Sequence, residues 1–323
     1  MLKQSFLVIA NGSYQTYIPE YIYFAQTSYP NVDVLVYISE NLDQNISKAL
    51  GILRANGFRF EIIKYDLEDC GIRRIDAIFN SQVSRCARWV LSDEKIKAYD
   101  EIYIGDIDLL ICKEKNNLFD EHRKHSIFLG LPYSDIVRPT RYIQFNATIK
   151  TMIRCGVFNT IWSYRYFKAK KYASFAETGL RYIKVKEYFE KLDPLLPRFK
   201  YLLHNYKRWG KLGFDLNPCM FSDEMFLFYM MKEAFEKVPL ASSGTFNDCP
   251  NSYDFRPHHG IHLRLFSTDS ITDVSSFRDL PESYSSYFKF YRAIDNEVHK
   301  QLKRYFSDFH KSEIIRLEKK IYG

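Results

Sequence analysis

Residues 101–111 read Glu-Ile-Tyr-Ile-Gly-Asp-Ile-Asp-Leu-Leu-Ile, a buried strand that ends in two carboxylates. The apolar run at residues 102–104 predicts a strand covered on both faces, and Gly105 lets the backbone turn. Asp106 and Asp108 follow, with a second apolar run behind them. Carboxylates in apolar surroundings are costly to bury unless a cation neutralises them, and hard oxygen ligands suit Mg²⁺ or Mn²⁺. We therefore expect a divalent cation here; solvated turn aspartates are the alternative.

The chain before this stretch alternates between apolar strands and helices. Strands are predicted at residues 5–10, 32–38, 58–65 and 127–131, and helices at 17–28, 47–56 and 77–91. This alternation is typical of a parallel sheet, whose ligands gather outside the carboxyl ends of the strands. The turn after the first strand is therefore a candidate nucleotide contact, and it contains Ala10, Asn11, Gly12 and Tyr14. A plain turn with a partly buried tyrosine is the alternative.

Several classes of protein are disfavoured. The sequence contains neither Gly-x-Gly-x-x-Gly nor a Walker A pattern, which disfavours dinucleotide dehydrogenases and P-loop enzymes. Its six cysteines form no Cys-x-x-Cys pair, so a zinc knuckle or a redox pair is unsupported. No signal peptide and no apolar run of membrane-spanning length is found, and we expect a cytoplasmic protein.

An Ala87-Arg88 pair lies in a helix-like segment a short distance before the acidic strand. Together with the Asp-x-Asp, this arrangement resembles the GT-A glycosyltransferases, most closely the glycogenin and bacterial galactosyltransferase-like family. The resemblance implies that Asp106 and Asp108 hold Mn²⁺ or Mg²⁺ on the diphosphate of a nucleotide-sugar, with a UDP-sugar as the expected donor. It also implies that Ile107 and Arg88 contact the donor, and that Tyr14 stacks on the uracil. The family often has an acid near the first turn, where this chain has Asn11.

Two later segments carry further residues of this resemblance. Asp223 and Glu224 open a predicted helix after Ser222, where the family contacts donor and acceptor sugars; complementing the helix dipole is the alternative role. In the His-rich stretch at residues 256–264, His262 matches the family's third metal ligand by its apolar-His-apolar context, with His259 as the alternative ligand. Arg264 follows and would contact the diphosphate.

Residues 138–211 form a basic region with seventeen Lys or Arg against four acids, within a chain of net charge +7. Tyr, Phe and Trp are interleaved with these charges. The resemblance implies that this region faces the acceptor, and its charge favours an anionic saccharide or glycoconjugate, or an anionic membrane surface. A solvated basic face is the alternative. Nucleic acid is not expected, because it leaves the acid pair unexplained.

The expected fold class is α/β, of the GT-A (Rossmann-like) type: a mixed, mostly parallel sheet flanked by helices, a helical basic acceptor region and a long C-terminal helix. The expected divisions are residues 1–131 for the nucleotide-sugar half, 132–221 for the acceptor region, 222–280 for completion of the core, and 281–323 for the helix. Apolar residues at spacings of three and four make that helix, at 283–322, amphipathic. It would pack on the body, or dock on a membrane surface or on a second copy.

The predicted function is a metal-dependent glycosyltransferase that transfers a sugar to a saccharide or other anionic acceptor, with retention of anomeric configuration implied by the resemblance. Two rivals remain at this stage. One is a metal-dependent nucleotidyl or phosphoryl transferase built on the same acid pair. The other is a non-catalytic protein that binds nucleic acid or lipopolysaccharide through the basic region.

Overall fold

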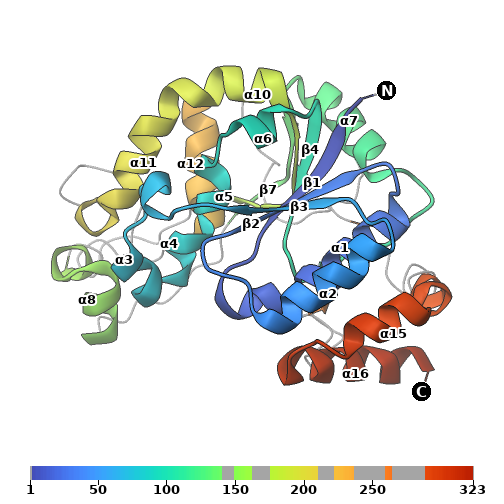
Figure 1. Ribbon diagram of the computed structural model, residues 1–323. Helices are drawn as coiled ribbons and strands as arrows, with labels where there is room; N and C mark the ends of the chain where they lie inside the picture. Colours follow the sequence, from blue (N-terminus) through green and yellow to red (C-terminus); the bar gives the residue numbers. More distant parts are fainter. Residues whose placement is uncertain are drawn as a thin grey trace.

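The computed structural model describes residues 2–139, 149–161, 175–209, 222–235, 259–263 and 288–322. Its centre is a six-stranded sheet in the order β3-β2-β1-β4-β9-β6 (Figure 1). The strands are β1 (Gln4–Ile9), β2 (Asp33–Ile38), β3 (Phe60–Lys64), β4 (Glu101–Ile104), β6 (Tyr133–Ser134) and β9 (Arg181–Lys184). The first four in sequence are parallel, and β9 runs antiparallel to both β4 and β6. The predicted mixed, mostly parallel sheet flanked by helices is therefore confirmed.

Side chains of the central strands alternate between two apolar layers. Phe6 and Val8 of β1 belong to one layer, while Leu7 between them belongs to the other. The first layer is completed by α1 (Ile18–Ser28), α2 (Gln44–Ala55), α7 (Leu118–Leu129), α15 (Glu297–Lys303) and α16 (Asp308–Tyr322). The second is completed by α4 (Ser81–Arg85), α5 (Ala87–Val90), α6 (Glu94–Lys97), α10 (Val185–Leu192), α11 (Leu196–His204) and α12 (Asp223–Ala234). Because successive side chains point to opposite faces, a sheet buried on both sides needs continuous apolar strands, as these are.

The remaining elements are short. Two small antiparallel sheets pair β5 (Leu109–Leu110) with β10 (Ile261–His262), and β7 (Val137–Pro139) with β8 (Phe175–Glu177). Helix α3 (Arg74–Phe79) precedes α4, and α8 is Ile149–Cys155. The 3₁₀ turns are η1 (Gly12–Tyr17), η2 (Glu68–Cys70), η3 (Asp193–Leu195) and η4 (Tyr206–Arg208).

Three helix and strand predictions were wrong in part. The predicted strand at 127–131 is the end of α7, which stops where Gly130 takes a left-handed conformation with φ of 65°. The predicted helix at 77–91 is divided, because Asn80 is extended and caps α4 through the Gln82 amide. The predicted long terminal helix is also interrupted within its described part: Asn296 accepts hydrogen bonds from the amides of Val298 and His299 and so begins α15 anew.

The C-terminal helices pack on α1 through a buried charged cluster. The Glu20 carboxylate of α1 lies 3.0 Å from His299 Nε2 of α15 and 2.6 Å from His310 Nε2 of α16, all three fully buried. The other ring nitrogen of His299 lies 3.0 Å from Asp295 Oδ1. Burial alone would raise the pKa of Glu20, but the two histidines outweigh it and lower the pKa to about 2.

Parts of the predicted acceptor region 132–221, at residues 140–148, 162–174 and 210–221, lie outside the described residues, and they include part of the basic region 138–211. The described parts of residues 132–221 contribute β6 and β9 to the central sheet. A search of the described residues for a helix long and apolar enough to cross a membrane found none.

Candidate active site

A cleft of about 520 Å³ lies where β1 and β4 end. The carboxyl ends of neighbouring parallel strands meet at one edge of a sheet, which explains why ligand sites form there. The cleft is lined by Ile9, Asn11, Tyr14, Ser81, Ser84, Arg85, Arg88, Gly105, Asp106, Ile107, Asp108, Asp223, Glu224 and His262. Most of the residues predicted for donor binding and catalysis are in this set.

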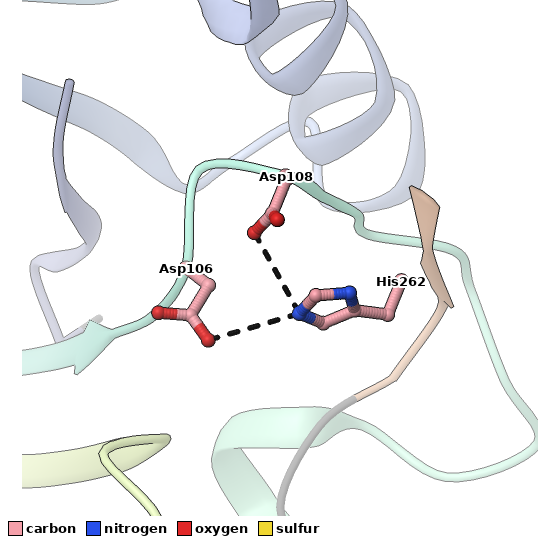
Figure 2. Close-up of side chains that lie close together, drawn as sticks. All are labelled: Asp106, Asp108 and His262. Carbon is pink, nitrogen blue, oxygen red and sulfur yellow. Dashed lines mark ion pairs between the residues drawn. The ribbon is translucent and has the colours of Figure 1, made fainter. Parts of the chain in front are cut away.

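Asp106, Asp108 and His262 line this cleft. Their side chains point toward one another, as Figure 2 shows. His262 Nε2 lies 3.9 Å from Asp106 Oδ2 and 3.6 Å from Asp108 Oδ1. The two acids stand on the turn after β4, whereas His262 belongs to β10. Antiparallel pairing with β5 brings β10 here, since His262 lies opposite Leu109. The Leu263 amide also donates to the Asp108 carbonyl at 2.9 Å.

The donor set of this cluster fits a divalent cation. One ligand atom from each side chain can be chosen so that all lie within 4.8 Å of one another. The two imidazole-to-carboxylate distances are longer than a hydrogen bond. They suit ligand atoms that each lie about 2.1 Å from one shared ion. Two carboxylates and an imidazole are suitable ligands for Mn²⁺ or Mg²⁺, with Mn²⁺ the better partner for nitrogen.

Arg88 joins the acid turn to helix α12. Its Nη1 lies 2.7 Å from Asp106 Oδ1, and its Nη2 lies 2.6 Å from Asp223 Oδ2. The Asp106 oxygen that faces His262 is the other one, so the guanidinium leaves the metal-facing oxygen available. Burial alone would raise the pKa of Asp106, but Arg88 and His262 outweigh it and lower the pKa below its ordinary value. Asp106 is therefore ionised at neutral pH, as a metal ligand must be.

The two predicted catalytic acids have different surroundings. Ser222 caps α12 through the Met225 amide, which places Asp223 and Glu224 in the first turn. Asp223 is 3% exposed and holds Arg88, so its oxygen is already engaged. Glu224 is partly exposed and lines the cleft. The position of Glu224 suits contact with a bound sugar better than that of Asp223.

Only some of the residues predicted to contact the nucleotide after β1 line the cleft. Asn11 and Tyr14 line the cleft, whereas Ala10 and Gly12 are not among its lining residues. Asn11 is fixed on both sides of its amide: its nitrogen donates to Tyr65 Oη at 2.6 Å, and its oxygen accepts from the Ser39 amide at 2.9 Å. Tyr14 is partly buried, and its ring centroid lies 5.9 Å from that of Tyr17.

His259 lies apart from the metal cluster. It is buried, and its two ring nitrogens contact Tyr29 Oη at 3.1 Å and Glu121 Oε2 at 2.6 Å. The structure thus brings His262, and not the alternative ligand His259, to the two acids. Arg264 lies outside the described residues.

Sequence reasoning missed three polar residues of the cleft, Ser81, Ser84 and Arg85. A signal for them was present, because they precede Arg88 at spacings of three, four and seven and so share a helical face with it. Among the described residues, no carboxylate forms an ion pair with Arg85, whereas two pair with Arg88. A cation at this wall suits an anionic ligand.

Comparison with known proteins gave structural matches alone. No family model matches the sequence, and no curated protein matches it. The structure is similar to solved GT-A-type glycosyltransferases. Core-mannan synthase A from Aspergillus fumigatus, in its Mn/GDP form, is 8% identical with a TM-score of 0.44, over 73% of this chain and 70% of that one.

The mannosyltransferase Ktr4p from S. cerevisiae is 11% identical with a TM-score of 0.44, over 72% of this chain and 66% of that one. The galactosyltransferase LgtC, solved with donor and acceptor sugar analogs, is 13% identical with a TM-score of 0.35, over 70% of each chain. These similarities concern the course of the chain, and the activity has to be argued from the cleft itself.

Proposed function

We propose that this chain is a metal-dependent glycosyltransferase that moves a sugar from a nucleotide-diphospho-sugar, with a UDP-sugar as the expected donor, to a saccharide or other anionic acceptor. The observation that carries the proposal is the convergence of Asp106, Asp108 and His262 in one cleft, beside Arg88. Two acids from one turn and an imidazole from a distant strand offer three ligand atoms to one cation.

Asp106, Asp108 and His262 would hold Mn²⁺ or Mg²⁺. Bound there, the cation supplies positive charge where the departing nucleoside diphosphate becomes more negative. Arg88 donates to Asp106 and so orients that carboxylate toward His262. Its fork is occupied by Asp106 and Asp223, which makes its first role one of positioning.

Glu224 is the residue we assign to the reacting sugar. Its carboxylate lines the cleft from the first turn of α12, where it can stabilise positive charge on the anomeric carbon or orient the acceptor hydroxyl. Asp223 instead keeps Arg88 in place. Tyr14, which lines the cleft near the end of β1, is the residue we assign to stacking on the nucleobase.

The acceptor is proposed to be anionic. The basic region supports this, as does Arg85, a cation on the cleft wall that has no carboxylate partner among the described residues. Contact with an anionic membrane surface and association of two copies remain predictions from the sequence.

Calorimetric titration with UDP, in the presence and absence of Mn²⁺, tests the proposal. We expect binding that requires Mn²⁺ and is lost in Asp108→Asn, while Asp69→Asn, an exposed acid of η2, binds as the wild type does. GDP is titrated in the same way for comparison, because the proposal includes UDP as the nucleotide of the donor. If no nucleoside diphosphate binds, the proposal that this chain is a glycosyltransferase is wrong.

Hydrolysis of a panel of nucleotide-sugars separates the rival enzyme class. A glycosyltransferase with water as acceptor releases the nucleoside diphosphate and the free sugar. A nucleotidyl or phosphoryl transferase cleaves a phosphate ester or anhydride bond and releases a nucleoside monophosphate or a sugar phosphate. Glu224→Gln should suppress the first pair of products, whereas products of the second kind would replace our assignment.

A further inference from the structure

Buried His259 and partly exposed Glu121 form a pair that the proposed reaction does not use. His259 is 1% exposed, and its Nε2 lies 2.6 Å from Glu121 Oε2. Glu121 belongs to the first turn of α7. On its other side, His259 Nδ1 contacts the hydroxyl of Tyr29, the residue that ends α1. His259 therefore contacts α7 and the end of α1, two helices in the first half of the chain, although it lies far from both in sequence.

The residues after His259 are held just as closely. Gly260 has φ of +124°, and a β-carbon there would lie 1.9 Å from the Leu110 carbonyl oxygen. Ile261 pairs with Leu110, and the Leu263 amide donates to the Asp108 carbonyl. His262 stands between these contacts. Its backbone is therefore tied to the acid turn at both ends.

We propose that His259 and Glu121 are positioning residues: they hold His262 in place and so raise the affinity of the proposed metal site for its cation, without contacting the cation themselves. The inference rests on the proposed metal site. With His259 anchored, β10 reaches β5 in the register that faces His262 toward Asp106 and Asp108. Because strand side chains alternate, a slip by one residue would turn His262 away and present Ile261 or Leu263 instead. The pair acts through backbone placement, since His259 uses one ring nitrogen on Glu121 and the other on Tyr29.

Titration of the full chain with Mn²⁺ alone, followed by electron paramagnetic resonance of the free ion, tests this role. Loss of partners that orient metal ligands typically weakens metal binding by about 10- to 100-fold, and we expect about 10-fold for Glu121→Gln. Tyr29→Phe, which removes a single hydroxyl, should weaken binding in the same direction by less. Asp120→Asn changes the neighbouring acid of α7, which pairs with Arg123, and should leave Mn²⁺ affinity unchanged.

A purely structural anchor predicts a different result. It would lower the melting temperature of Glu121→Gln and leave Mn²⁺ affinity of the folded protein unchanged, and that outcome overturns the positioning role. Affinity lost in Asp108→Asn but kept in both Glu121→Gln and Tyr29→Phe would likewise overturn it while leaving the metal site intact. A wild-type chain that binds no Mn²⁺ would remove the site and the inference together.

Discussion

Replacing Arg88 by glutamine removes a side chain that joins the acid turn to α12. The guanidinium uses both of its terminal nitrogens, one on Asp106 and one on Asp223. It also lies over the Trp89 ring at 4.3 Å. Glutamine is shorter and neutral, so it neutralises neither carboxylate. The two acids lose their cation to different degrees, because the Asp223 side chain is 4% exposed and that of Asp106 is 35% exposed.

The expected loss of stability follows from this difference in exposure. Leaving a buried carboxylate without its cation costs about 3–5 kcal/mol, and this applies to Asp223. An exposed ion pair contributes about 1 kcal/mol at most, and water screens Asp106 enough to place it near that limit. We therefore expect Arg88→Gln to lower the free energy of unfolding by about 4 kcal/mol. Adding Asp223→Asn should restore part of this, because the uncompensated charge is then gone.

Urea unfolding followed by circular dichroism at pH 7 measures these differences. Arg85→Gln is the matched control: it removes an arginine three residues earlier that is exposed, and it should change stability by less than about 0.5 kcal/mol. A cost below about 1 kcal/mol for Arg88→Gln would refute the argument from burial, since that is what a surface pair gives. A double variant no more stable than the single one would show that Asp223 is not the charge that matters.

Three further outcomes are expected. Stability should be highest between pH 4.5 and 6.5. Burial opposes the lowered pKa of Glu20, which its two histidines produce, and the contribution of Glu20 is lost as the pH falls below 4.5; urea midpoints of Glu20→Gln should not show this loss. Burial also opposes the raised pKa of His299, which Asp295 and Glu20 produce, and the contribution of His299 is lost as the pH rises above 6.5. Gly260→Ala should cost more than about 1 kcal/mol in the same assay, while Gly51→Ala, with open space around it, should not destabilise. Glu224→Gln should slow donor hydrolysis by about 100-fold with UDP affinity unchanged, and equal losses in both would contradict its assigned role.

The parallel half of the fold follows from local sequence patterns. Strands β1, β2 and β4 are largely apolar, strands alternate with helices in this part of the chain, and each of β1 to β4 lies within about two residues of its predicted bounds. Strands β6 and β9 are short and contain Tyr, Ser, Arg and Lys, so their sequences carry no comparable signal. Their strand character depends on partners: Arg181, for example, is tolerated in the sheet because Asp135 and Glu177 pair with it in the interior.

Some residues of the candidate site could likewise be predicted from local sequence, and others could not. Asp106 and Asp108 could be predicted from one strand and its flanks, and the resemblance to a known family added His262. The choice between His262 and His259 could not be made from spacing, since both lie near one glycine in the same His-rich stretch. It required the neighbours of each ring, which are Glu121 and Tyr29 for one and the acid turn for the other.

The pairing of β10 with β5 has a consequence for the order of folding. Residues 108 and 262 are separated by roughly half of the chain, and closing so long a loop is slow because it costs conformational entropy before any contact compensates for it. The acid turn belongs to a local α/β unit that can collapse early, whereas the imidazole arrives only when a distant segment docks. During synthesis the incomplete protein would thus lack His262, and the proposed metal site would be completed late.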